Sequence, residues 1–114
     1  GREPTSDHHV RVLGCGQAHL HQHVTAAKSL SDVGAAVALK RAQEKAGVDL
    51  HNIRYAGIYD SFTITLAILI EELGLAQRGE SAARARNGDF GINGALPLNT
   101  HGGLLSYGHC GCGG

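Results

Sequence analysis

Hydrophobic and polar positions follow regular patterns in the first half of the chain. Residues 10–13 alternate between apolar and polar side chains and stop at a glycine, which predicts a short strand, and residues 53–59 predict a second strand. Between them, apolar residues at helical spacing begin after Ser31 and Asp32 and stop before Gly47. We therefore expect a helix whose N-cap lies at Ser31–Asp32 and whose closing residue is this glycine.

A second helix is expected over about residues 62–73, and it is apolar on nearly every side. Glu71 and Glu72 are the charged side chains in this range and are expected to face water, and Gly74 is expected to end the helix. A chain this small has little material to cover such a helix, so we expect a larger body to surround it in an intact protein. The isolated chain is expected to self-associate through the uncovered apolar surface.

The order strand, helix, strand, helix predicts an α/β layered domain with a parallel sheet. Residues 77–93 are polar and rich in Gly and Arg, which indicates an excursion over the surface. Two short extended pieces, residues 95–99 and 103–107, are expected to be joined by a turn that contains Gly102.

Composition narrows the class of protein. The 114 residues fit one domain, and ten Lys and Arg against ten Asp and Glu give no general attraction to nucleic acid or anionic membranes. No apolar run is long enough to span a bilayer, and the first residues do not resemble a signal peptide. Three cysteines are too few for a disulfide framework, so we expect reduced thiols in the cytoplasm. Nine of the 17 glycines fall within residues 87–114, which indicates tightly turning backbone there.

Histidines and cysteines raise the question of a metal site. The histidines at positions 19, 21 and 23 alternate, so an extended segment would carry them on one face. No carboxylate or thiol stands beside them at ligand spacing, which favours a polar, histidine-rich loop. Cys110 and Cys112 form a C-x-C pair without a second motif to complete four zinc ligands. We therefore expect no metal site, and keep a metal-binding or scaffold fragment as an alternative.

Two shorter patterns carry little functional weight. Gly14-x-Gly16 after the first expected strand is half of a dinucleotide-binding fingerprint, and a tight turn is the favoured interpretation. The pair His8–His9 lies near the start of the chain and is interpreted as incidental.

Tyr59 and Asp60 stand where the second strand is expected to end and the apolar helix to begin. In layered α/β folds, the carboxyl ends of strands and the amino ends of helices converge on ligands. Tyr59 could donate a hydrogen bond to a developing oxyanion, and Asp60 could orient it or cap the helix. The alternative is that Asp60 is only a cap and Tyr59 only a core residue.

Residues 98–109 form the second candidate segment. A Gly-Gly turn at Gly102 and Gly103 precedes an apolar piece that would deliver Tyr107 and His109 into a tight pocket. The glycines would let a flat acyl or thioester group approach the backbone.

These segments resemble the thiolases, and within them the lipid-transfer or sterol-carrier-protein-x branch of acetyl-CoA acetyltransferases. Gly102-Gly103-x-x-x-x-Gly108-His109 is similar to the thiolase turn that ends in Gly-His-Pro, and residues 96–103 fit the lead-in of that branch. Residues 59–62 are similar to its His-Asp-Cys-Phe box. The resemblance implies an α/β, thiolase-like layered fold, of which this chain is part of the C-terminal half. It would form one partial domain, residues 1–114, with a Gly-rich active-site loop at residues 87–114.

The resemblance also implies a chemistry. His109 would activate a nucleophilic cysteine and help hold the thioester oxygen. Tyr59 would serve in the oxyanion hole or in proton transfer, with Asp60 as its orienter and Tyr107 as a second acid or base. The residues that would shape the loop and bind substrate are Asn99, Gly102, Gly103 and Gly108.

Several properties of the whole enzyme follow from the same resemblance. It implies an acyl-CoA substrate, no bound cofactor other than coenzyme A as substrate or product, and a homodimer. The family's two catalytic cysteines lie outside this chain, so we expect the chain alone to be inactive.

Two departures from the family leave the reaction open. Cys110 stands in place of the proline of the Gly-His-Pro turn, and neither it nor Cys112 is expected to replace a catalytic thiol. Tyr59 stands where ordinary thiolases have asparagine and the sterol-carrier branch has histidine. Some relatives in the lipid-transfer branch are retro-aldolases that cleave steroid-type β-hydroxyacyl-CoA with tyrosines and work with a small zinc-ribbon and OB-fold partner protein. We predict acyl transfer on a 3-oxoacyl-CoA, with retro-aldol cleavage as the alternative.

Overall fold

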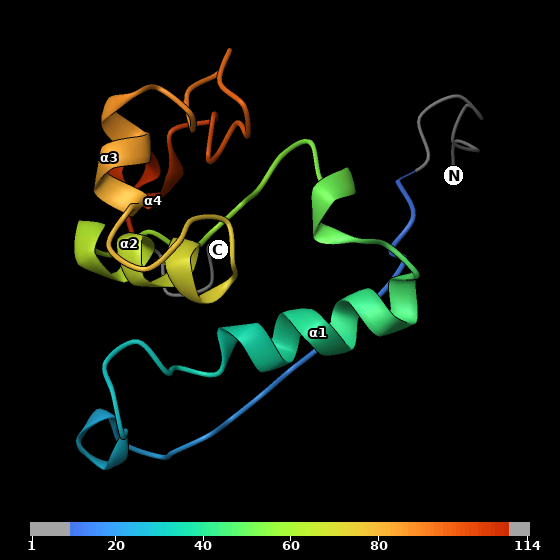
Figure 1. Cartoon of the computed structure of the whole chain (residues 1–114), viewed down its shortest axis with the longest axis vertical. Helices are drawn as coiled ribbons and strands as arrows, with labels where there is room; N and C mark the ends of the chain where they lie inside the picture. Colours follow the sequence, from blue (N-terminus) through green and yellow to red (C-terminus); the bar gives the residue numbers. More distant parts are fainter. Residues whose placement is uncertain (1–9, 110–114) are drawn as a thin grey trace, which may run out of the picture.

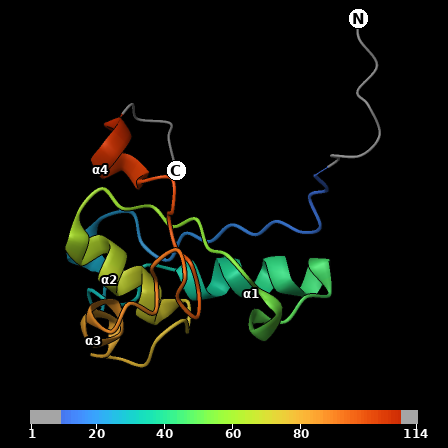
Figure 2. The same ribbon diagram turned by 90° about the horizontal axis from the view of Figure 1, so that it is seen from above.

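A computed structural model of the chain describes residues 10–109. The elements along the chain are η1 (Val24–Ala26), α1 (Ala35–Ala46), η2 (Leu50–Asn52), α2 (Thr63–Glu72), α3 (Ser81–Arg86) and α4 (Gly103–Tyr107). Helix α2 contacts both α3 and α1, and the extended first segment crosses beside α1 (Figures 1 and 2). Within residues 10–109, no helix combines the length and the apolar character that crossing a membrane requires.

The two longest helices lie where the hydrophobic pattern predicts them. Helix α1 ends at Gly47, which has a φ of 65° and whose N–H donates to the Gln43 carbonyl at 2.8 Å. This left-handed glycine closes the helix as expected. Helix α2 falls inside the predicted range and is followed by Gly74 at a φ of 75°.

The predicted N-cap of α1 at Ser31–Asp32 is wrong. The cap position is Gly34, which has no side chain to accept a hydrogen bond. The Glu72 carboxylate from α2 accepts hydrogen bonds from the N–H groups of Gly34 at 2.9 Å and Val33 at 3.3 Å. A carboxylate near the free N–H groups of a helix start stabilises it as a side-chain cap would.

Glu71 is also bonded within the protein, so both glutamates, which stay partly exposed to water as expected, make hydrogen bonds to other elements as well. The Glu71 carboxylate accepts from the Ser81 hydroxyl at 2.6 Å and from the Ser81 N–H at 3.2 Å, which joins α2 to α3. The Ser81 hydroxyl chiefly, then the backbone N–H groups of Gly79 and Ser81, and to a smaller extent the charge of Arg78, hold the pKa of Glu71 below its ordinary value of 4.5.

The two predicted strands do not form a sheet within residues 10–109. Residues 10–13 and 53–59 carry no strand assignment, and the β-type pairing in the described part is a single isolated parallel bridge between Ala56 and Leu98. The segment at residues 10–13 leaves Val12 87% exposed. A strand becomes part of a sheet only when a neighbouring strand pairs with its backbone N–H and C=O groups.

Gly14 and Gly16 continue the extended first segment beyond residue 13, and they do not form the expected tight turn. A Cβ atom on Gly16 would overlap the carbonyl of Ala38, and one on Gly14 would overlap the carbonyl of Ala42. The two alanines are one helical turn apart in α1. The glycines therefore allow the segment to lie directly on the backbone of this helix.

Two elements differ from the prediction in the second half of the chain. Residues 77–93 contain α3 in addition to surface turns. Within that stretch Arg84 pairs with Asp89 at 2.7 Å and lies 5.3 Å from the centre of the Phe90 ring. Residues 103–107 were expected to be extended and instead form helix α4.

The packed interior of the described part is small. The buried apolar side chains are Ile70 and Ala76. Helix α2 leaves Ile64 65% exposed, and Phe62 before it is 70% exposed. This agrees with the expectation that the chain by itself leaves the apolar helix partly uncovered.

Candidate functional site

The candidate site forms where residues 55–60 meet residues 97–109. Two backbone hydrogen bonds of 3.0 Å join the segments, from Ala56 N–H to the Pro97 carbonyl and from Asn99 N–H to the Ala56 carbonyl. The bridge between Ala56 and Leu98 lies at the same place. These contacts set the register of the two predicted site segments against each other.

Asn99 fixes this register with its side chain. Its Oδ1 accepts from the Ile58 N–H at 2.8 Å, and its Nδ2 donates to the Ile58 carbonyl at 2.7 Å. An amide can replace a neighbouring peptide group in this two-way pairing. Asn99 has a φ of 46°, and among residues 10–109 it is the one non-glycine residue with a positive φ. Asparagine tolerates this conformation better than most residues.

Asp60 connects the first segment to α4. It is 5% exposed, and its Oδ1 accepts a hydrogen bond from the Leu104 N–H at 2.9 Å. A Cβ atom on Gly103 would overlap the same carboxylate. Asp60 therefore caps α4, whereas the cap position of α2 is Phe62 and carries no side-chain cap bond. The hydrogen bond of Asp60 is with this helix and not with the Tyr59 hydroxyl, so the structure gives no contact for its predicted role as orienter of Tyr59.

Tyr59 and His109 come together across 50 positions of sequence. The Tyr59 hydroxyl is in hydrogen-bonding contact with His109 Nε2. The ring centres are 5.8 Å apart with the planes at 74°, an edge-on arrangement. Either the phenol donates to a neutral imidazole nitrogen or the imidazole N–H donates to the phenol oxygen, because both groups can do either. A proton can therefore pass between the two side chains.

Tyr107 lies in a different contact. Its ring stacks on that of His101, with centres 6.0 Å apart and planes at 24°. His101 Nδ1 in turn lies 3.3 Å from the Tyr55 hydroxyl. His101 lies in the predicted turn and Tyr55 in the predicted second strand, and the sequence suggested no role for either residue. The signal that could have found Tyr55 is its spacing of four from Tyr59, which puts both on one face of extended chain.

The predicted loop glycines adopt backbone conformations that other residues avoid. The φ angles are 106° at Gly102, 62° at Gly103 and 80° at Gly108. The first two turn the chain into α4, with the Gly102 N–H donating to the Asn99 carbonyl at 2.8 Å. This turn was predicted, and its glycines allow the left-handed backbone conformations that it requires.

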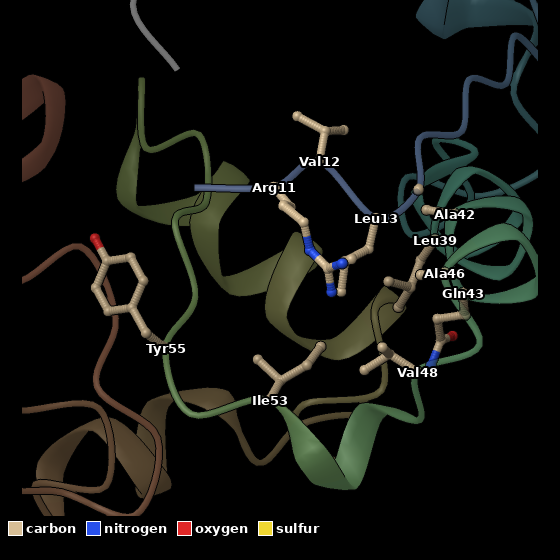
Figure 3. A pocket seen from close by; sticks show the side chains of 11 residues that line it. Arg11, Val12, Leu13, Leu39, Ala42, Gln43, Ala46, Val48, Ile53 and Tyr55 are labelled. Carbon is tan, nitrogen blue, oxygen red and sulfur yellow. The ribbon is translucent and has the colours of Figure 1, made fainter. Parts of the chain in front are cut away.

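A cavity of about 590 Å³ opens beside the site (Figure 3). It lies between the first extended segment, α1 and residues 53–55, with the Arg11 side chain pointing into it and Tyr55 at one end. The remaining residues that line it are Val12, Leu13, Gly14, Leu39, Ala42, Gln43, Ala46, Val48 and Ile53.

No metal-ligating cluster is formed by the described residues. Among residues 10–109, no group of three or more His, Cys, Asp or Glu side chains is placed to hold a metal ion. His19 instead contacts the Gln17 amide at 2.7 Å. Cys110 and Cys112 of the alternative ligand set lie outside the described residues, as does the pair His8–His9.

Known proteins are similar to this chain in sequence. A steroid side-chain-cleaving aldolase from Thermomonospora curvata is 41% identical over 61 residues, which cover 54% of this chain and 16% of that protein. The BbsB subunit of benzoylsuccinyl-CoA thiolase from Thauera aromatica is 33% identical over 66 residues, or 58% of this chain and 17% of the relative. Human sterol carrier protein 2 is 32% identical over 72 residues, or 63% of this chain and 13% of the relative.

A solved structure is similar as well. The chain matches the structure named "Ltp2-ChsH2(DUF35) aldolase" with a TM-score of 0.68 and 30% identity, covering 82% of this chain and 26% of that one. The described part therefore has the fold of part of a thiolase-like domain. The chain spans only 13 to 17% of the length of the relatives described above.

The thiolase C-terminal domain-like family matches residues 16–114, which is most of the sequence. The predicted resemblance to thiolases and to their sterol-carrier branch is thus confirmed. This chain belongs to the thiolase C-terminal domain-like family.

Proposed function

We propose that this chain is part of an enzyme that cleaves or forms a carbon–carbon bond in an acyl-CoA, with Tyr59 and His109 as its proton-transfer pair. The observation that carries the proposal is the contact between the Tyr59 hydroxyl and His109 Nε2. A phenol titrates near pH 10 and an imidazole near pH 6.5, so a phenol alone is a poor base at neutral pH. A histidine within hydrogen-bonding reach can take its proton and return it.

Retro-aldol cleavage of a β-hydroxyacyl-CoA makes the fullest use of this pair. Tyr59 would remove the proton of the β-hydroxyl group while its own proton moves to His109. The Cα–Cβ bond would then break, leaving a carbonyl product and an enolate of the thioester. The enolate carbon would take a proton back through Tyr59, which restores both side chains and releases the shortened acyl-CoA.

Similarity to aldolases supports this reaction. Two of the proteins described above, a relative and a solved structure, carry aldolase in their names. One acts on a steroid side chain by its name, so a steroid-type acyl group is the substrate that we propose first. The solved aldolase is named for two proteins, Ltp2 and ChsH2, which supports a small partner protein for the intact enzyme.

Acyl transfer to coenzyme A is the second candidate. It is favoured by the Gly108–His109 turn and by the similarity to a benzoylsuccinyl-CoA thiolase subunit. In that reaction His109 would activate a cysteine from a part of the enzyme outside this chain, and Tyr59 would hold the thioester oxygen. The homodimer, the cytoplasmic location and the lack of a bound cofactor remain predictions.

The two reactions are separated by assaying an intact enzyme that contains this chain. Retro-aldol activity would release a ketone or aldehyde from a β-hydroxyacyl-CoA without added coenzyme A. Acyl transfer would consume coenzyme A and a 3-oxoacyl-CoA. We expect the first result, and turnover of the 3-oxoacyl-CoA alone would establish acyl transfer instead.

Substitution of Tyr59 then tests the pair itself. Tyr59→Phe should lower kcat about 10²- to 10⁴-fold, the range for loss of a general acid–base group. Tyr107→Phe tests the predicted role of Tyr107 as a second acid or base: a comparable fall in kcat would support that role, whereas a much smaller fall would leave Tyr59 as the proton-transfer tyrosine. Equal activity of Tyr59→Phe and wild type would show that Tyr59 is not a proton-transfer residue.

A further inference from the structure

A second tyrosine–histidine pair lies next to the first. The Tyr55 hydroxyl contacts His101 through Nδ1, the Tyr59 hydroxyl contacts His109 through Nε2, and the two tyrosines are four positions apart in the same extended segment. Residues four apart in extended chain lie on one face, so both histidines approach the segment from the same side. The two histidines flank α4, one before it and one after it.

Helix α4 needs such external support. It has five residues, and an isolated helix of this length is not stable in water. Asp60 holds its first turn through the Leu104 N–H. Its last residue is Tyr107, whose ring stacks on His101, and His101 in turn contacts Tyr55. The helix is thereby attached to the extended segment at both ends.

His109 depends on the second attachment. It follows Tyr107 by two residues, with only Gly108 between them, and Gly108 has a φ of 80° and a ψ of 160°. The Gly108 N–H donates to the Leu104 carbonyl at 2.8 Å, which ties the chain after Tyr107 to α4, so the position of His109 follows that of the end of the helix. The contacts that run from Tyr55 through His101 to Tyr107 hold this end.

We infer that His101 is a positioning residue, which holds the end of α4 so that His109 meets Tyr59. This inference deepens the proposed function, since it concerns the same proton-transfer pair. His101 acts through its two contacts: its Nδ1 fixes the ring on the Tyr55 hydroxyl, and its ring face supports Tyr107. It is not assigned a catalytic role, because these contacts do not include Tyr59 or His109.

The test is nuclear magnetic resonance on the full 114-residue chain, which needs no catalytic turnover. The chain carries Phe62→Ser and Ile64→Ser throughout, because these substitutions reduce its exposed apolar surface and keep it towards the monomer. The readout is the nuclear Overhauser contact between the rings of Tyr59 and His109, with the chemical shift of the His109 ring as a second signature. Loss of the His101 contacts in His101→Ala should lower the ratio of paired to separated rings about fivefold. His51→Ala is the matched control, because it removes another exposed histidine, whose hydrogen bond to Asp49 is made by its backbone N–H, and it should leave the contact unchanged.

Two further variants keep the inference falsifiable if His101→Ala disturbs the whole chain. Tyr55→Phe removes one hydroxyl and keeps every ring, so it should weaken the Tyr59–His109 contact without shifting the amide resonances of α1. Tyr107→Phe keeps the stacking ring and should retain the contact. An unchanged Tyr59–His109 contact in both His101→Ala and Tyr55→Phe would overturn the inference.

Failure of the inference and failure of the proposed function give different results. If the ring contact is lost in His101→Ala but an intact enzyme has neither proposed activity, the positioning role stands and the reaction is wrong. If the ring contact persists while the Tyr59→Phe enzyme loses turnover, the proposed function stands and His101 has no positioning role.

Discussion

Asp60 and Leu104 are joined by a hydrogen bond of 2.9 Å between a buried carboxylate and a backbone N–H. This bond connects the start of the α2 segment to the first turn of α4, across 44 positions of sequence. It places the two candidate segments against each other. Because the carboxylate is buried, its loss leaves the N–H of Leu104 without a partner.

Asp60→Ala should therefore weaken the attachment of α4 by about 1–2 kcal/mol, the usual cost of losing a capping side chain. Hydrogen exchange of the Leu104 amide measures this directly, and its protection should fall. Asp60→Asn is the matched variant, since it keeps an oxygen acceptor and should retain part of the protection. Equal protection in wild type and Asp60→Ala would show that the bond does not hold α4.

Gly103→Ala should displace α4 more strongly. The new Cβ would overlap the Asp60 carboxylate, and alanine is strained at a φ of 62°. Gly79→Ala is the control, because Gly79 has a φ of 83° but open space where a Cβ would lie. Circular dichroism and amide shifts of α4 should change more in Gly103→Ala than in the control, and similar changes would argue against the close contact with Asp60.

Gly16→Ala should separate the first segment from α1. Its Cβ would overlap the Ala38 carbonyl, a backbone atom that cannot move aside without bending the helix. Nuclear Overhauser contacts between this segment and α1 should disappear. Gly57→Ala serves as the comparison, because its nearest non-neighbouring atom would be 3.9 Å away, and it should leave these contacts in place.

The stability of the α2–α3 contact should depend on pH through Glu71. Its folded-state pKa is lowered, chiefly by the hydroxyl of Ser81, so its contribution is present above the ordinary value of 4.5 and is lost as the pH falls through the lower folded value. Protection of the Ser81 amide should decrease on acidification below 4.5. Glu71→Gln should abolish this loss of protection at low pH, whereas Glu44→Gln, in α1, should preserve it.

The exposed apolar surface before and within α2 should cause self-association of the chain. Phe62 and Ile64 are 70% and 65% exposed, and apolar patches of this kind bind one another in water. Sedimentation should show oligomers or aggregates, and the double variant Phe62→Ser, Ile64→Ser should shift the distribution towards monomer. A wild-type chain that sediments as a monomer at high concentration would contradict the prediction.

Features that depend on a few neighbouring residues could be predicted from the amino-acid sequence. Helical periodicity located α1 and α2, and glycines with left-handed conformations ended them at Gly47 and Gly74. Ordered short motifs were sufficient to identify the family. Both kinds of information are local, because periodicity and backbone preference act over one or two turns.

Contacts between distant groups could be identified only from the three-dimensional structure. Asp60 was expected to orient Tyr59 or to cap the following helix, and it caps α4 instead. Glu72 caps α1, and Tyr55 contacts His101. These pairs are separated by 38 to 46 positions, so no window of the sequence contains both partners. The helical state of residues 103–107 has the same origin, because a five-residue helix depends on a carboxylate supplied from elsewhere in the chain. Apart from the bridge between Ala56 and Leu98, the predicted strands formed no sheet within residues 10–109 for the complementary reason. Alternation favours extended chain, but a sheet requires neighbouring strands with which its backbone can bond.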